Sequence, residues 1–387
     1  MQMGKFTYLD DFLKEHVQKG PVGCGCAVAR DGETLYEGYF GYADLENKKP
    51  ITPDSIYRQF SMTKVVVCTA AMMLFERGRF LMNDPIYEYF PEWKNTMVAE
   101  EGENGAVVIR PVKRPIRVKD CFSMAMGIGY GGEDYTHQVM NQVRANLEES
   151  VGNYTLRQDI YAMSQVPVKF DPGTHFLYGF GHELVAGLIE VVSGKTVGEF
   201  LKEEIFDPLE MKSTGYRYFG DTRERMVTPY LLKEDGSRVP TTAMMDKRHE
   251  PDSKYEGGGA GLFSTVRDYL KFSQMLACGG VWNGGQIIGR KTIDLMRSNQ
   301  MNEQQMKDFT NSYLDGYGYG YGVRTMVNPG AGSSTSVGEF GWTGAMGTYV
   351  SIDPSEKASV VYMHNLDPNM EEYTHIRVRN IAYGALK

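Results

Sequence analysis

Apolar residues recur at helical spacing in several segments of the chain. The segment 6–18 carries four of them on one face, which predicts an amphipathic helix: Leu9, Phe12, Leu13 and Val17. Residues 62–77 are rich in Val, Met, Leu and Ala and precede Gly78, so they predict a buried helix that ends at a glycine. Further helical patterns occupy the segments 182–192, 197–206, 266–277, 290–298 and 370–386.

Alternating apolar and polar residues predict strands near both ends of the chain. Residues 24–29 and 34–40 flank the dipeptide Asp31-Gly32, which indicates a β-hairpin. Toward the C-terminus, successive strands are predicted over 317–327, 338–342, 348–352 and 359–364. Strands at both ends with helices between them favour one antiparallel sheet built from both termini, with a helical region inserted.

We therefore expect an α+β fold that consists of an α/β sandwich lobe and a helical lobe. The sheet lobe would comprise 1–58 and 305–387, the mostly helical lobe 59–304, and the functional site would lie between them. Residues 98–112 are expected to form a surface excursion. The polar segment 131–155, with aromatic residues scattered among charges, fits a lid or a mobile loop.

Composition narrows the classes of function. The 387 residues are 42% hydrophobic and carry a net charge of −8 without Lys/Arg blocks, which argues against nucleic-acid and membrane partners. Neither an apolar leader nor a run of 18 apolar residues is present, so a cytoplasmic location is expected. The cysteines lie mostly in apolar runs, which favours buried thiols in a reducing compartment: Cys24, Cys26, Cys68, Cys121 and Cys278.

The run Ser61-Met62-Thr63-Lys64 is the first candidate for chemistry. Residues i and i+3 share a helical face, so the Lys64 ammonium is expected beside the Ser61 hydroxyl at a helix N-terminus. A serine hydroxyl is a weak nucleophile, and a neighbouring lysine can help to remove its proton. Because S-x-x-K matches arise by chance in most chains of this length, the motif by itself leaves an ordinary helix start as the alternative.

Longer runs around this motif carry a family resemblance. They are Gly41-Tyr-Ala-Asp-Leu-Glu46, Pro50-Ile-Thr-Pro-Asp54, Phe60-Ser-Met-Thr-Lys64, Phe170-Asp-Pro-Gly-Thr174 and Gly257-Gly-Gly-Ala-Gly-Leu-Phe-Ser-Thr265. Together they resemble the serine β-lactamase and penicillin-binding-protein superfamily, and most closely its class C β-lactamase and family VIII carboxylesterase branch. The resemblance covers most of the chain. It implies a serine β-lactamase/DD-peptidase-like fold and catalysis through Ser61 and Lys64, without a metal or a cofactor.

The second motif of this family, Tyr-x-Asn, corresponds here to Tyr178-Gly179-Phe180. The resemblance implies that Tyr178 shares the role of base with Lys64, because nearby positive charge favours ionisation of a phenol. The family's Asn is absent, and Phe180 cannot form a hydrogen bond with a substrate amide. An ordinary buried aromatic residue is the alternative interpretation of Tyr178.

The third motif, Lys-Thr-Gly or His-Thr-Gly, corresponds to Trp342-Thr343-Gly344. The resemblance implies that these residues bind substrate, and that the N–H groups of Ser61 and Ala345 form the oxyanion hole. Trp342 replaces the cation that would pair with the carboxylate of a β-lactam or of a peptide C-terminus. An indole offers a flat apolar wall instead, as in many family VIII esterases and related acyltransferases. A core tryptophan on a strand is the alternative.

A further departure from the family lies in Phe122-Ser-Met-Ala-Met-Gly127, where a Thr-His-Thr-Ser-Gly-like run is usual. Met124 and Met126 replace the polar side chains and predict a more apolar wall near the site. Tyr130 matches an aromatic residue at the rim of the active site in relatives. Together with Phe180 it is expected to contact substrate.

These observations favour a serine hydrolase that forms an acyl-enzyme at Ser61 and acts as a carboxylesterase on small or medium acyl esters. The lost cation before Thr343 and the lost Asn at position 180 both remove contacts for peptide-like substrates, so an ester ranks above a lactam. The alternatives are a β-lactamase, a D-amino-acid peptidase or amidase, an acyltransferase, and a non-catalytic binding protein of the same fold. The expected partner is a small-molecule ester or amide, and the sequence does not define the oligomeric state.

Overall fold

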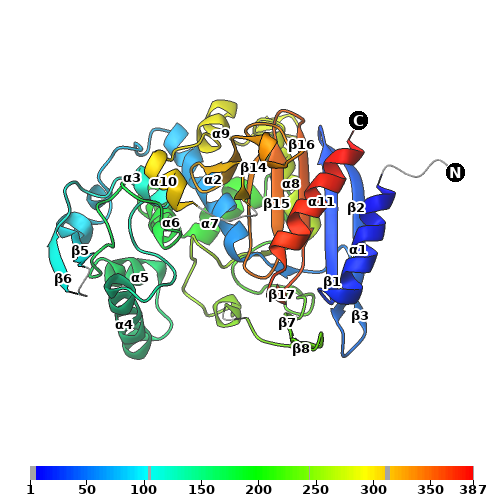
Figure 1. Ribbon diagram of the computed structural model, residues 1–387, viewed down its shortest axis with the longest axis horizontal. Helices are drawn as coiled ribbons and strands as arrows, with labels where there is room; N and C mark the ends of the chain where they lie inside the picture. Colours follow the sequence, from blue (N-terminus) through cyan, green and yellow to red (C-terminus); the bar gives the residue numbers. More distant parts are fainter. Residues whose placement is uncertain (1–5, 103–105, 244, 310–313, 387) are drawn as a thin grey trace.

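An antiparallel sheet joins the two ends of the chain (Figure 1). The computed structural model describes residues 6–102, 106–243, 245–309 and 314–386, and within them this sheet has eight strands in the order β12-β13-β14-β15-β16-β1-β2-β3. The strands are β1 (Gly23–Arg30), β2 (Glu33–Asp44), β3 (Lys49–Pro50), β12 (Tyr317–Tyr319), β13 (Arg324–Met326), β14 (Phe340–Thr343), β15 (Tyr349–Asp353) and β16 (Ala358–Met363). The expected α+β fold, with a sheet built from both termini, is confirmed.

The β1–β2 hairpin forms where the sequence predicts it. Asp31 and Gly32 both have positive φ, 52° and 83°, and this backbone geometry suits the twist of a tight hairpin. On its other edge β1 pairs with β16, from Gly25 opposite Met363 to Arg30 opposite Ala358. This pairing joins the N-terminal and C-terminal strands of the sheet, which lie more than three hundred residues apart in the sequence.

Helices cover both faces of the sheet. Side chains of β1 alternate between the faces, so Cys24, Cys26 and Val28 contact one helical layer while Ala27 and Ala29 contact the other. The first layer consists of α1 (Thr7–Lys19) and α11 (Glu371–Ala385), which lie side by side in Figure 1. The second layer contains α8 (Val266–Ala277), which packs against β1, β15 and β16.

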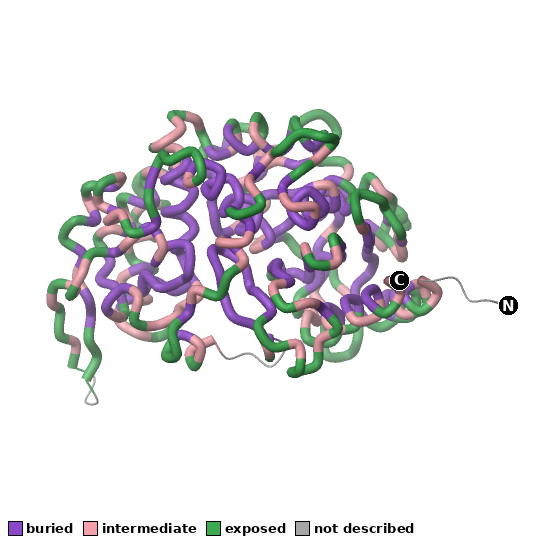
Figure 2. The backbone as a smooth tube through the Cα atoms, turned by 90° about the horizontal axis from the view of Figure 1, so that it is seen from above, coloured by how far each residue is buried: buried purple, intermediate pink, exposed green. Residues whose placement is uncertain are grey.

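The helical region is organised around α2 (Thr63–Glu76). Twelve of its fourteen residues are buried, as expected for a helix that is apolar on every side. It packs against α6 (Gly181–Ser193), α7 (Val197–Leu201) and α9 (Arg290–Met296). The other α-helices among the described residues are α3 (Val118–Phe122), α4 (Tyr135–Val151), α5 (Leu156–Met163) and α10 (Glu303–Asp308). In Figure 2 buried backbone runs through the middle of the molecule and exposed backbone surrounds it.

Short strand pairs complete the structure. They are β4 (Tyr57–Arg58) with β9 (Phe263–Ser264), β5 (Met97–Glu101) with β6 (Val107–Pro111), β10 (Val281–Trp282) with β11 (Gly285–Gln286), and β7 (Tyr230–Leu232) with β8 (Arg238–Pro240) and β17 (Leu366–Asp367). The excursion expected over 98–112 is thus the β5–β6 hairpin, although residues 103–105 lie outside the described part. The division into lobes at 58/59 and 304/305 stays a prediction.

Two expectations from the sequence need correction. The segment 131–155 is not an irregular loop, because most of it forms the 17-residue helix α4. Asp134 caps this helix by accepting a hydrogen bond from the backbone N–H of His137 at 2.9 Å. The single strand expected over 317–327 is two strands, β12 and β13, that pair with each other across a turn.

The cysteines and the helix lengths bear on two further expectations. All five cysteines are free thiols, and Cys278 is the one that is partly exposed. None of the helices in the described ranges is both long and apolar enough to cross a membrane. The cytoplasmic location stays a prediction.

Candidate active site

Ser61 lies in a single 3-10 turn, η1 (Phe60–Met62), that leads directly into α2. Phe60, the residue before it, has a φ of 45°, a left-handed conformation that costs a non-glycine residue about 1–2 kcal/mol. This conformation turns the chain sharply between β4 and α2. The turn leaves Ser61 partly exposed while its neighbours Gln59 and Met62 are buried. Strain at such a position is typical of functional sites.

Lys64 follows Ser61 by one helical turn and is completely buried. Its Nζ donates hydrogen bonds to Oγ of Ser61 at 3.1 Å and to the carbonyl oxygen of Gly259 at 2.6 Å. The same nitrogen lies 4.8 Å from the ring centroid of Tyr130 and 4.7 Å from that of Tyr178. The amine is therefore held in one place and directed at the serine hydroxyl.

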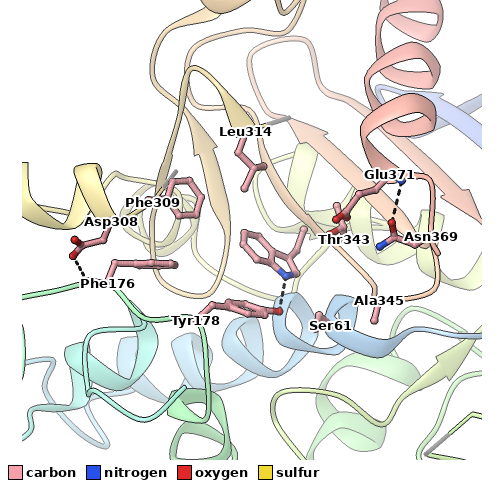
Figure 3. Close-up of a pocket in the computed structure, with 11 residues that line it drawn as sticks. Ser61, Phe176, Tyr178, Asp308, Phe309, Leu314, Thr343, Ala345, Asn369 and Glu371 are labelled. Atoms are coloured by element: carbon pink, nitrogen blue, oxygen red, sulfur yellow. Dashed lines mark hydrogen bonds between the residues drawn. The ribbon is translucent and has the colours of Figure 1, made fainter. Parts of the chain in front are cut away.

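Tyr178 and Trp342 form a pair beside this lysine. The indole Nε1–H of Trp342 donates a hydrogen bond of 2.9 Å to the hydroxyl of Tyr178, and their ring centroids are 5.3 Å apart. In Figure 3 the phenolic oxygen points toward Ser61. A donor aimed at that oxygen stabilises negative charge on it when the phenol gives up its proton.

If Lys64 and Tyr178 share the role of base, as the resemblance implies, both should lie within hydrogen-bond reach of the Ser61 hydroxyl and of each other, and the structure differs from this expectation. Hydrogen bonds that link the serine, the lysine and the tyrosine with one another would be typical of a coupled base. In the described residues, Lys64 bonds to Ser61 but meets Tyr178 through the face of its ring, and no hydrogen bond joins Tyr178 to Ser61. The hydroxyl of Tyr178 accepts instead from Trp342, and Lys64 donates instead to the carbonyl oxygen of Gly259.

A pocket of about 300 Å³ opens above Ser61 (Figure 3). Five of the residues predicted from the sequence line it: Ser61, Tyr178, Trp342, Thr343 and Ala345. Sequence reasoning missed the other lining residues, which are Phe176, Asp308, Phe309, Leu314, Asn369 and Glu371. Phe176, two residues before Tyr178, could have been found from its spacing. The others come from distant segments without a motif.

The end of β14 approaches η1 closely because of Gly344. A Cβ atom on this residue would lie 2.4 Å from the carbonyl oxygen of Gln59 and 2.1 Å from Oγ1 of Thr348. Thr348 in turn donates to the Gln59 carbonyl at 3.0 Å. This packing brings Ala345 and Ser61 to the same pocket, as an oxyanion hole between them requires. The oxyanion hole itself stays a prediction.

Tyr130 and Phe180 lie behind Tyr178 rather than in the lining of the pocket. The ring of Tyr130 contacts the rings of Tyr178 and Phe180 edge-on, at centroid distances of 5.3 and 4.6 Å. Both thus belong to an aromatic layer next to Lys64. Met124 and Met126 are buried, and the sulfur of Met124 accepts a hydrogen bond of 3.4 Å from the N–H of Gly179. A direct contact of Tyr130 or Phe180 with substrate stays a prediction.

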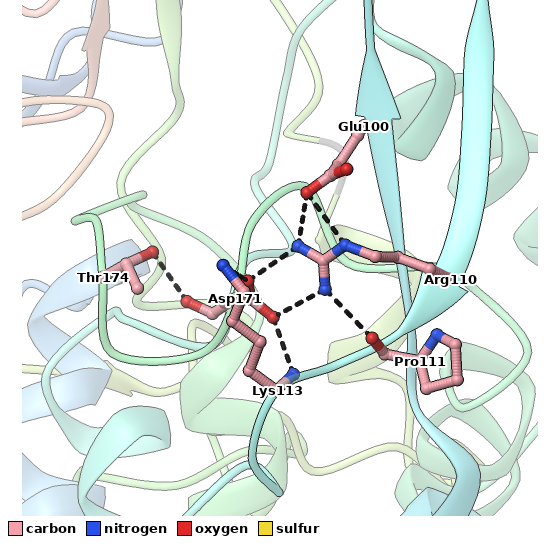
Figure 4. A network of polar contacts seen from close by, with 6 residues as sticks. All are labelled: Glu100, Arg110, Pro111, Lys113, Asp171 and Thr174. Atoms are coloured by element: carbon pink, nitrogen blue, oxygen red, sulfur yellow. Dashed lines mark hydrogen bonds and ion pairs between the residues drawn. The ribbon is translucent and has the colours of Figure 1, made fainter.

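The segment that leads to Tyr178 is anchored at Asp171 (Figure 4). Its carboxylate accepts hydrogen bonds from the Arg110 guanidinium at 2.8 and 3.1 Å and from the backbone N–H of Lys113 at 2.8 Å. The bond to Arg110 is the main reason why the pKa of Asp171 lies far below its ordinary value. Thr174 adds a bond to the carbonyl of Asp171 at 2.7 Å. Through Arg110, the β5–β6 hairpin thereby holds in place the chain segment that precedes Tyr178.

The pocket has an acidic character. Asp308 accepts hydrogen bonds from the backbone N–H of Phe176 at 2.9 Å and from Nδ1 of His175 at 3.0 Å. Burial tends to raise the pKa of Asp308, but these bonds hold it below its ordinary value, so the carboxylate is charged. Glu371 supplies a second carboxyl group, and the described residues that line the pocket include no Lys, Arg or His.

Comparisons with known proteins bear on the family and the fold of this chain. Protein Rv1367c of Mycobacterium tuberculosis is 26% identical over 343 residues, which cover 85% of this chain and 82% of that protein. Esterase EstB of Burkholderia gladioli is 23% identical, over 89% of this chain and 86% of its own. The solved structure of EstCE1, a hydrolase with promiscuous acyltransferase activity, superposes with a TM-score of 0.82 at 21% identity over 98% of both chains, which shows a shared fold.

A family model described as Beta-lactamase matches residues 9–383. The runs that carried the resemblance in the sequence all lie inside this match. Since the model spans nearly the whole chain, the protein belongs to the beta-lactamase family.

Proposed function

We propose that this protein is a serine carboxylesterase that acts on small or medium acyl esters through an acyl-enzyme at Ser61. The observation that carries the proposal is the buried Lys64 amine, which lies 3.1 Å from the hydroxyl of Ser61. Ser61 itself lines a pocket that has aromatic walls and no basic side chain among its described lining residues. The activated serine supports acyl transfer, and the lining of the pocket supports a neutral substrate.

The mechanism follows from the positions of these groups. Ser61 Oγ attacks the ester carbonyl, and its proton passes to the Lys64/Tyr178 pair. The carbonyl oxygen gains the negative charge and would be stabilised by the N–H groups of Ser61 and Ala345. The pair then protonates the departing alcohol, which leaves the acyl group bound to Oγ. A water molecule then attacks the acyl carbonyl and gives a proton to the pair. The pair returns this proton to Oγ as the bond between Oγ and the acyl carbon breaks, which releases the carboxylic acid and free Ser61.

The substrate preference rests on Trp342, Asp308 and Glu371. Trp342 stands where a cation would bind a substrate carboxylate, and its single N–H already bonds to Tyr178. The carboxyl groups of Asp308 and Glu371 line the same pocket and disfavour the binding of a negatively charged substrate group there. Neutral esters therefore suit the pocket better than β-lactams or peptides with a free carboxylate.

The test is a panel of p-nitrophenyl esters of rising acyl length, run beside a chromogenic cephalosporin on wild type and Ser61→Ala. We expect turnover of short and medium esters by wild type, little turnover of the cephalosporin, and none of either by the variant. A fluorophosphonate probe should label wild type alone. An ester-inactive wild type that resists the probe would instead support a binding protein, and a preference for the cephalosporin would support a β-lactamase.

A second candidate is transfer of the acyl group to an alcohol instead of water. The similarity to EstCE1, whose name includes promiscuous acyltransferase activity, favours it together with the aromatic walls of the pocket, which suit an organic alcohol. Adding butanol to the ester assay separates the two. A transferase would form the butyl ester and raise the rate of p-nitrophenol release, whereas a strict hydrolase would form the free acid alone.

A further inference from the structure

A buried carboxyl group, that of Glu183, lies next to the residue that binds Lys64. Glu183 is in the first turn of α6 and is 5% exposed. A Cβ atom on Gly259 would lie 2.8 and 2.9 Å from the two carboxyl oxygens of Glu183. The carbonyl of the same glycine accepts the 2.6 Å hydrogen bond from Lys64 Nζ. Gly259 thus contacts both groups: its α-carbon faces the Glu183 carboxyl, and its carbonyl oxygen binds the Lys64 amine.

The surroundings of Glu183 leave its charge poorly compensated by direct contacts. Its Oε2 atom is buried without a hydrogen-bond partner in the described part of the chain. The titratable and charged groups that face the carboxyl are Lys64, Tyr130, Arg144, Asp159, Tyr216 and Tyr255. An unpaired buried charge is costly, so the carboxylate depends on the nearest available cation.

Of the two cations in this group, Lys64 is the one that remains available. Arg144 is bound to Asp159, with a distance of 2.6 Å between Nη2 and Oδ2, and Tyr255 donates to the same oxygen at 2.8 Å. Within the described ranges Lys64 forms no ion pair shorter than 4 Å, and its bonds go to a hydroxyl and a carbonyl. Glu183 and Lys64 are therefore complementary charges that interact across Gly259.

We propose that Glu183 is a positioning residue for the Lys64/Tyr178 pair: its carboxylate stabilises the Lys64 ammonium across Gly259 and so sets the pH at which the pair can accept the proton of Ser61. The inference rests on the proposed esterase function. Negative charge beside the pair opposes loss of a proton from either member, whether the lysine or the tyrosine gives it up.

The pKa of the Glu183 carboxyl determines the pH range in which this group is charged. Burial raises the pKa of its carboxyl to about 7, while Lys64 and Arg144 oppose that rise. The carboxyl is consequently charged over the alkaline range, in which the base of the site is expected to form. The carboxylate therefore acts on the Lys64/Tyr178 pair in the same pH range in which the pair is expected to become an active base.

The test compares pH profiles of kcat/KM for p-nitrophenyl butyrate. In Glu183→Gln the midpoint of the rising limb should move to lower pH by about half a unit or more, because the negative charge next to Gly259 is lost. Glu183→Asp keeps the charge and should restore a midpoint close to that of wild type. An unchanged midpoint in Glu183→Gln, or a shift to higher pH, would overturn the proposal.

Glu190→Gln is the matched control. Glu190 lies two turns further along α6, and burial raises its pKa to about 7 as well, but Glu256 is the next contributor and Lys64 is not among the groups that act on it. The same chemical change there should leave the midpoint where it is in wild type. An equal shift in this variant would show that the effect is not specific to Glu183 and would also overturn the proposal.

A second measurement needs no activity. Thermal unfolding at pH 8 of wild type, Glu183→Gln, Lys64→Met and the double variant forms a double-mutant cycle. Lys64→Met should lower Tm less in the Glu183→Gln background than in wild type, because it no longer strands a buried carboxylate. Additive changes in Tm would overturn the coupling. If wild type turns over no ester, the proposed function fails, and this cycle still decides whether Glu183 and Lys64 interact.

Discussion

Trp342 donates a hydrogen bond to the hydroxyl of Tyr178 at 2.9 Å, and this bond joins two motifs that are 164 residues apart in the sequence. The family's usual lysine or histidine at this position would direct a cation at the substrate. The indole uses its single donor on the tyrosine instead. The replacement therefore does two things at once, because it removes a site for a carboxylate and supports the phenolic oxygen.

Replacing Trp342 with Phe tests the second of these effects. The ring is kept while the donor is lost, so we expect kcat for p-nitrophenyl butyrate to fall about tenfold, the value of one hydrogen bond to a developing charge. KM should change little, because the apolar surface remains. Steady-state kinetics measure both. Tyr319→Phe is the control, since the ring of Tyr319 packs against Trp342 with a centroid distance of 5.2 Å and its buried hydroxyl has no described partner.

Tyr178→Phe removes the phenolic oxygen from the pocket. If Tyr178 is part of the base, kcat should fall by about 10²-fold or more, the usual scale for losing a general base. Pre-steady-state measurements of p-nitrophenol release would show that acylation is slowed. A loss of less than about threefold would assign the proton transfer to Lys64 alone.

Trp342→Lys restores a cation at the third motif. The lysine would offer a substrate carboxylate a charge-assisted hydrogen bond, worth about 1.5–3 kcal/mol. We expect the ratio of kcat/KM for p-nitrophenyl butyrate to that for a cephalosporin to fall by about tenfold or more. A wild type that already prefers the cephalosporin, or a ratio that stays the same after substitution, would remove Trp342 as the determinant of selectivity.

The Glu190→Gln variant should differ from wild type in how its free energy of unfolding depends on pH. Burial, followed by the charge of Glu256, raises the pKa of Glu190 from 4.5 to about 7 in the folded protein. The folded state thus holds a proton that the unfolded state has lost, and wild type loses stability as pH rises from about 4.5 to 7. At pH 8 the Gln variant should be more stable by about 1 kcal/mol, a value reduced for the partial exposure of Glu190. Below pH 4.5 the difference should disappear, which urea unfolding across this range would check.

Much of the fold could be predicted because its patterns are local. The hairpin at Asp31-Gly32 and the helices α1 and α2 follow from spacings of two and of three to four residues, which backbone hydrogen bonds impose directly. Helix α4 was missed because its buried side is narrow: Thr136 and Met140 are its only buried residues among those described, although Asp134 was present as a cap. A helix with so few apolar residues depends on packing against α5, which no local pattern reveals.

In the candidate site, too, local contacts could be predicted from the sequence, whereas contacts between distant segments could not. Ser61 and Lys64 are three residues apart on one helix, so helical geometry alone places the amine beside the hydroxyl, and the sequence determined that contact. The tertiary structure decided that Trp342 bonds to Tyr178 and that Gly259, 195 residues from Lys64, accepts its second hydrogen bond. It also decided that the Glu183 carboxyl lies beside that glycine. Such contacts arise when the sheet and the helical region pack together, and side chains from distant segments then share one water-poor volume in which charges and hydrogen bonds must be matched.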